Sequence, residues 1–374
     1  MLQARPHSVL RATMPHCHVA NVDAIDDDGS EASLAHARAE MQQLINGPLT
    51  REIRNLVWVY EITRPERPAS PQLGLGGMAL TSEIRTPEHP RGVIIRNEGI
   101  RESKARGRAR LTEATRADMG TVNLAIDDTT GLFQAALESH ARGNAPAFTA
   151  TDETGSRHRV WPVDDPTAIA RFRALLAAEP RAYVADGNHR SAAAALLGYP
   201  HYLAVFFAAK TMTIAPYNRL VDASAVPRGD LIALLRTNFH VDPQPGGAYQ
   251  PEQTHDVGLY DGTRWVRLRP KSGTFDPRDA AEDIDAAIVQ RRFFADVLHV
   301  ADARDDRLTF VGANRDAHWL QKEVDSGRFR LAVTLPPVTM RQFVDVCLQD
   351  KLMPPKSTWF VPKIRSGLVM ALLD

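Results

Sequence analysis

Five consecutive residues in the middle of the chain combine a carboxylate, an amide, an imidazole and a guanidinium. They are Asp186–Arg190, within the stretch AYVADGNHRSAAAALLG that spans residues 182–198. The apolar run before them is typical of a buried strand, and the alanine-rich run after them is typical of a helix. A helix that starts directly after a strand presents unpaired backbone N–H groups at its first turn. Gly187 permits the tight turn and the close approach of a ligand.

This arrangement suits an anion, because the start of a helix combines backbone donors with a partial positive charge. Arg190 adds a guanidinium fork that fits phosphate oxygens, and His189 adds a second donor. Asp186 beside a phosphate requires a cation or a substrate hydroxyl between the two. On the motif alone a structural interpretation has equal weight: Asp186 caps the helix, Arg190 pairs with a surface acid and His189 packs.

A second acid follows a predicted strand in IIRNEGIRESKARGRARL, residues 94–111. Glu98 lies just past the strand end, a position from which side chains reach a cleft. Its carboxylate could accept a hydroxyl proton during phosphoryl transfer. A solvated loop glutamate is the simpler interpretation when the sequence is taken alone.

A stiff loop near the C-terminus, MPPKSTWFVPK, brings cations and hydroxyls together between prolines. Proline presets the backbone, so such a loop can be rigid without a large core beneath it. Its donors suit an oxyanion or a phosphate: Lys356, Ser357, Thr358 and Lys363. The alternative is a structural crossover whose lysines face water.

The stretch APYNRLV places three further polar side chains after a turn proline: Tyr217, Asn218 and Arg219. Arg219 could pair with a phosphate or a substrate carboxylate, and Tyr217 could stack or hydrogen-bond. A buried structural network is equally compatible with these residues.

The triplet His16-Cys17-His18 has metal-ligating side chains, but neighbours on an extended chain point to opposite faces. No second Cys/His pair at zinc spacing occurs, so we leave the metal question open and assign no site to the triplet.

These motifs resemble known families. DGNHRSAAA resembles the Gly-x-His-Arg helix start of the ParB/sulfiredoxin-like superfamily, whose enzymes bind nucleotide phosphates there, and more closely the Asp-Gly-His-His-Arg motif of archaeal free-serine kinases. The whole chain resembles domain-of-unknown-function family 1015, also through MTIAPYNRLV, VDSGRFRLAVTLPP and MPPKSTWFVPKIRSGL. We expect this match to run from about residue 56 to the end. Asn188 and Asn97 replace histidines of the family pattern, and its Pro-Pro-Tyr-Asp segment is missing.

The resemblance implies a phosphotransferase that acts on the hydroxyl of free serine or a similar small hydroxy compound. The donor would be ATP or ADP, with pyrophosphate as an alternative, and Mg²⁺ is expected with it. In this scheme Glu98 is the base and Asp186 orients the hydroxyl or a magnesium ion. The transferred phosphate is held by the helix start with Gly187, Asn188, His189 and Arg190, and the donor chain is neutralised by the loop with Lys356, Ser357, Thr358 and Lys363. Lys104 and Arg110 correspond to later basic residues of the family.

Two other functions stay open. A diverged member of the same family could use another acceptor in a biosynthetic pathway. A nucleotide-responsive, ParB-like regulator could bind DNA or protein, although no helix-turn-helix signature is visible. Lys plus Arg equals Asp plus Glu at 45 each, and this zero net charge argues weakly against a dedicated nucleic-acid binder.

Composition places the chain among ordinary globular proteins: 374 residues, 44% of them hydrophobic. Only Cys17 and Cys347 occur, which fits a reducing compartment. No apolar run is long enough for a membrane span and no secretory leader is visible, so we expect a cytoplasmic protein. The sequence does not define an oligomeric state.

Predicted helices and strands alternate along the chain, which indicates an α/β or mixed α+β class. We expect a ParB/sulfiredoxin-like nucleotide-binding core with additional α/β elaboration. The predicted segments are a variable N-terminal part (1–55), a catalytic core (56–225) and a C-terminal α/β region (226–374) that returns its Met-Pro-Pro-Lys-Ser-Thr loop to the site.

Overall fold

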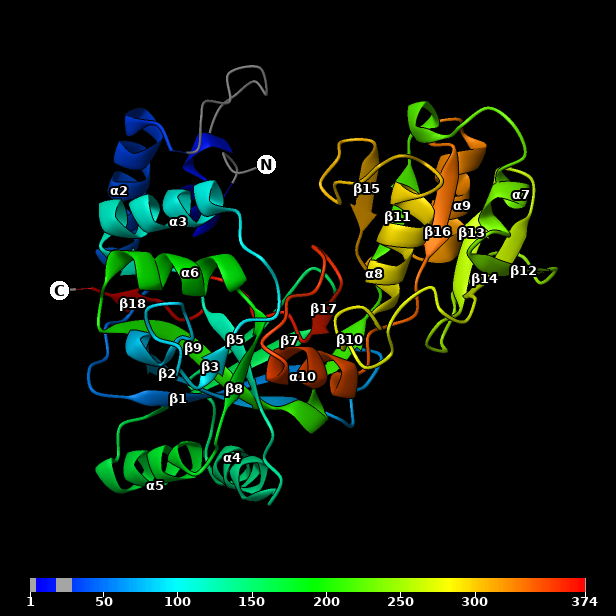
Figure 1. The fold of residues 1–374 in the computed structure, drawn as a ribbon. Coiled ribbons are helices and arrows are strands. Elements are labelled where there is room, and N and C mark those ends of the chain that lie inside the picture. The colour runs from blue at the N-terminus through cyan, green and yellow to red at the C-terminus, as the bar shows by residue number, and fades with distance from the viewer. Residues whose placement is uncertain (1–4, 18–28, 374) are drawn as a thin grey trace. The chain divides into compact units, whose positions relative to one another are not determined.

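The computed structural model describes residues 5–17 and 29–373, which fold into two compact units (Figure 1). The first unit contains residues 1–96, 100–212 and 362–374, and the second contains residues 97–99 and 213–361. The chain therefore leaves the first unit after Met212 and returns to it at Pro362. The three predicted segments stay a prediction about domains; their boundary at 225/226 falls inside the second unit.

The first unit is built on an eight-stranded mixed sheet of order β3-β8-β5-β9-β2-β1-β7-β6. Most neighbours are antiparallel, but β3 and β8, and β5 and β9, run parallel. The strands are β1 (Val57–Thr63), β2 (Gln72–Leu80), β3 (Ile94–Ile95), β5 (Val122–Ile126), β6 (Phe148–Thr151), β7 (Arg157–Val163), β8 (Ala182–Asp186) and β9 (His201–Ala208). Strand β5 is buried throughout and β8 is buried up to Asp186, because both faces of the sheet are covered there.

Helices cover both faces of this sheet (Figure 1). On one face α6 (Asn188–Leu197) packs on β5 and β9, α3 (Glu102–Thr115) packs on α6, and α2 (Glu31–Ile45) packs on α3. On the other face α4 (Leu132–Gly143) packs on β1, β2 and β9, next to α5 (Pro166–Ala177). A short helix, α1 (Leu10–Thr13), contacts α2.

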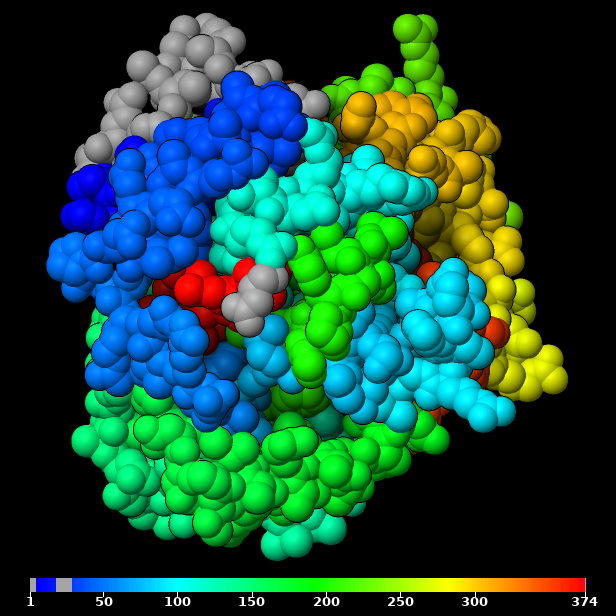
Figure 2. Space-filling view, turned by 90° about the vertical axis from the view of Figure 1, so that its left-hand side faces the viewer, coloured from blue at the N-terminus to red at the C-terminus, as the bar shows by residue number. Residues whose placement is uncertain are grey.

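The last residues of the chain complete the first unit. Strand β18 (Ala371–Leu372) pairs with β4 (Ala117–Asp118), which follows α3 directly. Figure 2 shows these C-terminal residues, in red, at the surface between blue residues of the N-terminal part and green residues from the middle of the chain. The return therefore ties the end of the chain to elements more than 250 residues earlier.

The second unit is an antiparallel sheet of order β12-β14-β13-β16-β11-β15. Its strands are β11 (Asn218–Val221), β12 (Phe239–Pro243), β13 (Val257–Tyr260), β14 (Trp265–Pro270), β15 (Leu308–Val311) and β16 (Leu331–Thr334), with a separate pair β10 (Thr213–Ala215) and β17 (Trp359–Val361). Its helices are α7 (Leu231–Leu235), α8 (Asp285–Val289) with a π-helical turn over Gln290–Ala295, α9 (Ala317–Asp325) and α10 (Met340–Leu348). Helix α9 buries Leu320 and Val324 against Leu220 and Trp265.

The predicted mixed α/β class is confirmed, and the finer ParB/sulfiredoxin-like core stays a prediction. The predicted strand-to-helix junction at 182–198 is confirmed as β8 with α6. The apolar region 201–221 contains three strands, β9, β10 and β11. Within the described residues no helix is both long and apolar enough to span a membrane.

Two glycines of the first unit give opposite stability predictions. A Cβ on Gly76 in β2 would lie 1.9 Å from the buried indole of Trp58, whereas a Cβ on Gly107 in α3 would have no neighbour within 4 Å. We expect Gly76→Ala to lower the free energy of unfolding by about 1–3 kcal/mol, through overpacking. Gly107→Ala should raise it by about 0.5–1 kcal/mol, because alanine is the better helix former. Thermal unfolding of the full chain measures both, and shifts of the same sign would contradict this packing.

Candidate functional site

The centre of the candidate site in the first unit is the Asp186 carboxylate, which lies between two cations. Asp186 is the last residue of β8, and its Oδ2 accepts a hydrogen bond from Arg190 Nη2 at 2.7 Å. Its Oδ1 accepts one from Lys363 Nζ, also at 2.7 Å. The three side chains are 33–40% exposed, so small solutes can reach them. Within these three side chains one negative charge faces two positive charges, which leaves this cluster with a net positive charge. Arg190 also favours the ionised form of the buried Asp118, although burial raises the pKa of that carboxyl.

The two cations decide the ionisation of Asp186. Burial acts to raise its pKa, but the charges of Arg190 and Lys363, with their hydrogen bonds, hold the pKa well below the usual range of an aspartate. Asp186 is therefore ionised at neutral pH, and both of its oxygens are occupied by cations.

The turn after β8 gives Arg190 its position. Gly187 has a φ of 102°, which a residue with a side chain rarely adopts, and α6 begins there with no side-chain cap. The structural alternative in which Asp186 caps the helix is therefore wrong. Arg190 also packs against Gly120, where a Cβ would lie 2.6 Å from Arg190 Cδ. The Arg190 Nε is buried and has no hydrogen-bond partner within the described part of the chain.

Gly120 is a site residue that the sequence reasoning missed. It lies 70 positions before Arg190, and no motif marks it.

His189, which was predicted to donate to a phosphate, accepts a hydrogen bond at Nε2 from the backbone N–H of Arg101 at 3.0 Å. Because that nitrogen acts as an acceptor, donation by a neutral His189 must come from Nδ1. Asn188 is the first residue of α6, and Lys104 and Arg110 are exposed on α3.

The remaining predicted residues gather in the second unit. Met353 N donates to Asn97 O at 2.9 Å, and Glu98 forms a parallel bridge with Met353. Arg219 Nη2 donates to Lys356 O at 3.1 Å, and its Nη1 donates to Tyr217 O at 2.7 Å. Three motifs that are far apart in the sequence thus meet within this unit.

Asn218 and Arg219 form the buried network that the sequence analysis left open as an alternative. Arg219 is 3% exposed, and burial lowers its pKa to about 9 against the opposing influence of Tyr217 and Glu98. Its guanidinium lies 4.4 Å from the centroid of Phe310. The Asn218 amide donates to Gln250 Oε1 and accepts from Leu335 N. These contacts hold the backbone of the unit together.

The proline-flanked loop is divided between the two units. Lys356 is exposed, at a φ of 59°, with its Nζ 5.6 Å from the ring centroid of Tyr217. Ser357 is buried, and its hydroxyl donates to Pro354 O at 2.8 Å, which closes the turn. Thr358 is partly exposed in the same unit, whereas Lys363 belongs to the first unit.

No cluster of three or more His, Cys, Asp or Glu side chains that could hold a metal ion occurs in the described residues. His16 and Cys17 belong to the residues that the structure describes, and His18 lies outside those residues. Both cysteines are free thiols.

Fold and site together define a two-unit α/β protein in which a strand-to-helix turn carries a carboxylate between two cations. The chain belongs to the family described as "Protein of unknown function (DUF1015)", whose model matches residues 1–292. The predicted family is thus confirmed, but its extent was wrong: the match includes the first 55 residues and ends before the motifs at 324–337 and 353–368. No curated protein matches the sequence.

Several solved structures show a distant likeness. A free serine kinase in complex with AMP is 9% identical, with a TM-score of 0.43 over 76% of this chain and 87% of that one. A conserved hypothetical protein from Pyrococcus furiosus is 9% identical, with a TM-score of 0.42 over 78% and 93%. C-terminally truncated SbnI from Staphylococcus aureus is 9% identical, with a TM-score of 0.41 over 78% and 85%. These values are too low to assign an activity to this chain.

The pairing of Asp186 predicts a pH dependence of stability. Because the pKa of Asp186 is lower in the folded than in the unfolded chain, its contribution is fully present above about pH 4 and is lost as the pH falls towards the folded pKa. Asp186→Asn should therefore lower the melting temperature most at pH 6–7, and the difference from wild type should shrink between about pH 5 and 2. Asp164→Asn, at an exposed carboxylate, is the control. A difference that does not change with pH would contradict this electrostatic role.

Proposed function

We propose that the cluster of Asp186, Arg190 and Lys363 binds the phosphoryl oxygens of a nucleotide donor, and that the protein is a phosphotransferase. The acceptor is the hydroxyl of free serine or of a similar small hydroxy compound. The donor is ATP or ADP, with pyrophosphate as the alternative. The observation that carries the proposal is the net positive charge of this accessible cluster at the uncapped start of α6.

Phosphate oxygens fit the groups that this turn presents. The first turn of a helix without a side-chain cap offers backbone N–H donors and a partial positive charge. The Nε of Arg190 has no hydrogen-bond partner in the described residues, but it is buried, so a ligand reaches it only if the Arg190 side chain shifts. Asp186 offsets one of the two positive charges of Arg190 and Lys363, and a bound anion would offset the other. Both cations could bind that anion while Asp186 holds their side chains in place.

Magnesium does not fit Asp186 in this arrangement. Both carboxylate oxygens are within 2.7 Å of a cationic nitrogen, so a metal ion would have to displace Lys363 or Arg190. The sequence suggested that Asp186 orients the acceptor hydroxyl or a magnesium ion, and this arrangement counts against the magnesium role. We propose in addition that Asp186 holds Arg190 and Lys363 in place.

The proposed reaction needs positioning and charge neutralisation, not a protein nucleophile. The acceptor oxygen forms a bond to the terminal phosphorus of the donor while the bond from that phosphorus to the leaving phosphate oxygen breaks. The hydroxyl proton passes to a base, for which we propose the Glu98 carboxylate. The Arg190 and Lys363 cations offset the charge of the phosphoryl oxygens. The choice of serine rests on the motif resemblance alone.

A turnover assay tests the reaction class. The protein is incubated with magnesium, with ATP, ADP or pyrophosphate, and with a panel of hydroxy amino acids, and products are identified by mass spectrometry. Phosphoserine supports the proposal as stated. Phosphorylation of another acceptor only would support a diverged biosynthetic enzyme. Nucleotide binding without transfer, together with a salt-sensitive shift of DNA, would replace the proposal by a nucleotide-responsive regulator.

Glu98→Gln separates catalysis from donor binding. If Glu98 is the base, the variant should lose about two to four orders of magnitude in kcat and keep its affinity for ADP. Glu252→Gln, an exposed glutamate in the same unit, is the matched control. Wild-type turnover by Glu98→Gln would remove Glu98 from the scheme.

Arg190→Ala should have the complementary effect. Loss of a charge-assisted hydrogen bond to phosphate should weaken ADP binding about 10- to 100-fold, measured by isothermal titration calorimetry. Arg171→Ala on α5 removes an exposed arginine of the same unit and should leave the affinity unchanged. Equal effects of the two variants would show that general surface charge, and not this turn, attracts the nucleotide.

A further inference from the structure

The segment that carries Lys363 is attached to the first unit at several points, and we call residues 362–367 the strap. At its start, Pro362 O accepts a hydrogen bond from the buried Asn123 at 3.4 Å, and Lys363 pairs with Asp186. At its end, Gly367 has a φ of 83° and packs so closely that a Cβ there would lie 2.5 Å from Val9 Cγ1. Between these points the strap is held by Arg365.

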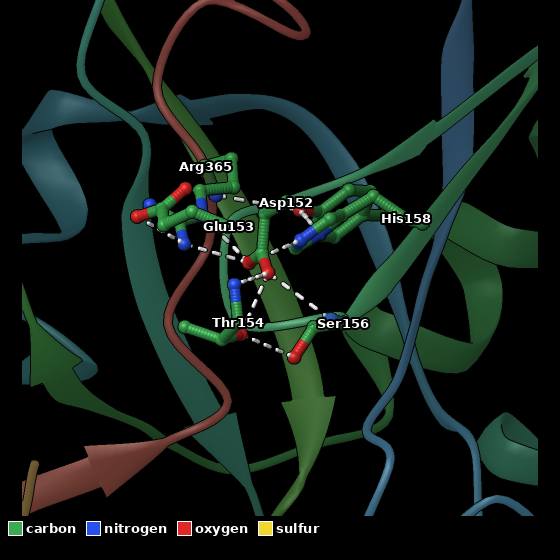
Figure 3. Close-up of polar contacts among 7 residues, drawn as sticks. Asp152, Glu153, Thr154, Ser156, His158 and Arg365 are labelled. Atoms are coloured by element: carbon green, nitrogen blue, oxygen red, sulfur yellow. Dashed lines mark hydrogen bonds and ion pairs between the residues drawn. The ribbon is translucent and has the colours of Figure 1, made fainter.

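Arg365 is bound by Asp152, whose two carboxylate oxygens accept hydrogen bonds from different partners (Figure 3). Asp152 Oδ1 closes the hairpin turn between β6 and β7, because it accepts from Thr154 N, Thr154 Oγ1 and Ser156 N at 2.8, 2.6 and 3.0 Å. Asp152 Oδ2 accepts from Arg365 Nε and Nη2 at 2.9 and 2.7 Å, and from His158 Nε2 at 3.0 Å. Burial acts to raise the pKa of Asp152, but the hydrogen bonds from Thr154, His158 and Arg365 outweigh it and hold the pKa well below the usual range.

The same histidine connects Asp152 to a tyrosine beneath the strap. His158 Nε2 faces a carboxylate and therefore carries the proton, which leaves Nδ1 to accept from the Tyr60 hydroxyl at 2.8 Å. The Tyr60 oxygen in turn accepts from the backbone N–H of Arg365 at 3.3 Å. Tyr60 is 1% and His158 2% exposed, so a broken link in this chain would leave a buried polar group unpaired.

The network thus fixes Arg365 twice, through its backbone and through its guanidinium. Lys363 lies two residues earlier, so its Cα can be at most about 7 Å from that of Arg365. A lysine side chain is flexible, and an ion pair at a partly exposed site does little to order it. Anchoring its backbone nearby limits the conformations that Nζ can adopt.

We propose that Tyr60, His158 and Asp152 are positioning residues that hold the strap and thereby keep the Lys363 ammonium at Asp186. The part of this inference that concerns ligands rests on the proposed phosphate-binding role of the cluster. None of the three residues is assigned a reacting group; they act through Arg365 and Lys363.

Two substitutions loosen the strap with little change in volume. Tyr60→Phe removes the hydroxyl that joins Arg365 to His158. Asp152→Asn can keep Oδ1 on the hairpin turn while an amide N–H₂ group faces the donors of His158 and Arg365. Tyr202→Phe is the matched control for the first variant, since Tyr202 is 2% exposed in the same sheet and its hydroxyl has no hydrogen-bond partner in the described residues. Asp164→Asn is the control for the second, because it makes the same change at an exposed carboxylate of the same unit.

The first readout needs no ligand. The full-length variants are acetylated briefly with an N-hydroxysuccinimide ester, and modification of Lys363 is quantified by mass spectrometry relative to the exposed Lys104. We expect Tyr60→Phe and Asp152→Asn to raise the relative rate at Lys363 about fivefold, the factor that corresponds to one ordinary hydrogen bond. Both controls should match the wild type, and thermal melting identifies any variant that fails to fold.

The second readout is the affinity for ADP, measured on the same proteins by calorimetry. A decrease of about fivefold in both strap variants, with both controls unchanged, supports the positioning role. Unchanged Lys363 labelling in both strap variants overturns the inference, and so does increased labelling with wild-type ADP affinity. A wild-type protein that binds neither ADP nor pyrophosphate overturns the proposed function, whereas the labelling still decides whether the network holds Lys363.

Discussion

The central constraint in this protein is the charge of Asp186 at the end of an interior strand. A carboxylate in a partly enclosed position is costly unless positive groups compensate it. One cation, Arg190, comes from the next helical turn and needs only local geometry. The other, Lys363, is supplied by a segment 177 residues later in the chain. A local strand-to-helix motif thereby becomes dependent on the return of the C-terminal residues to the first unit, and on the buried network beneath them.

The local part of this arrangement could be predicted from the sequence, because it depends on short-range patterns. An apolar run, an Asp-Gly turn and an alanine-rich stretch predict a strand, a positive-φ glycine and a helix, and residues 182–198 adopt all three. The partners of Asp186 could not be predicted, since nothing in the sequence links it to Lys363. Gly120 is similar: its role is to leave room for Arg190, and only a three-dimensional contact shows that.

Polar residues in the second unit show a different limit. Arg219 and Asn218 were predicted to contact a ligand. In the structure their side chains form hydrogen bonds with backbone groups and with Gln250. A buried polar residue that holds the fold and one that binds a ligand look the same in a single sequence. The stretch Asn218–Val221 is buried throughout, and that burial distinguishes the two cases only once the neighbouring strands are known. The sequence nevertheless selected three motifs that meet in this unit.

The division of the first unit into separate parts of the chain affects how it is made. Residues 213–361 are synthesised between its main body and its last residues, so β8 and α6 leave the ribosome well before Lys363 and Arg365 do. During that interval Asp186 has Arg190 as its cationic partner, and Asp152 lacks the guanidinium that it binds in the finished protein. The turn carries no excess charge at that stage of translation. The cluster of Asp186, Arg190 and Lys363 gains its net positive charge when Lys363 has emerged and docked.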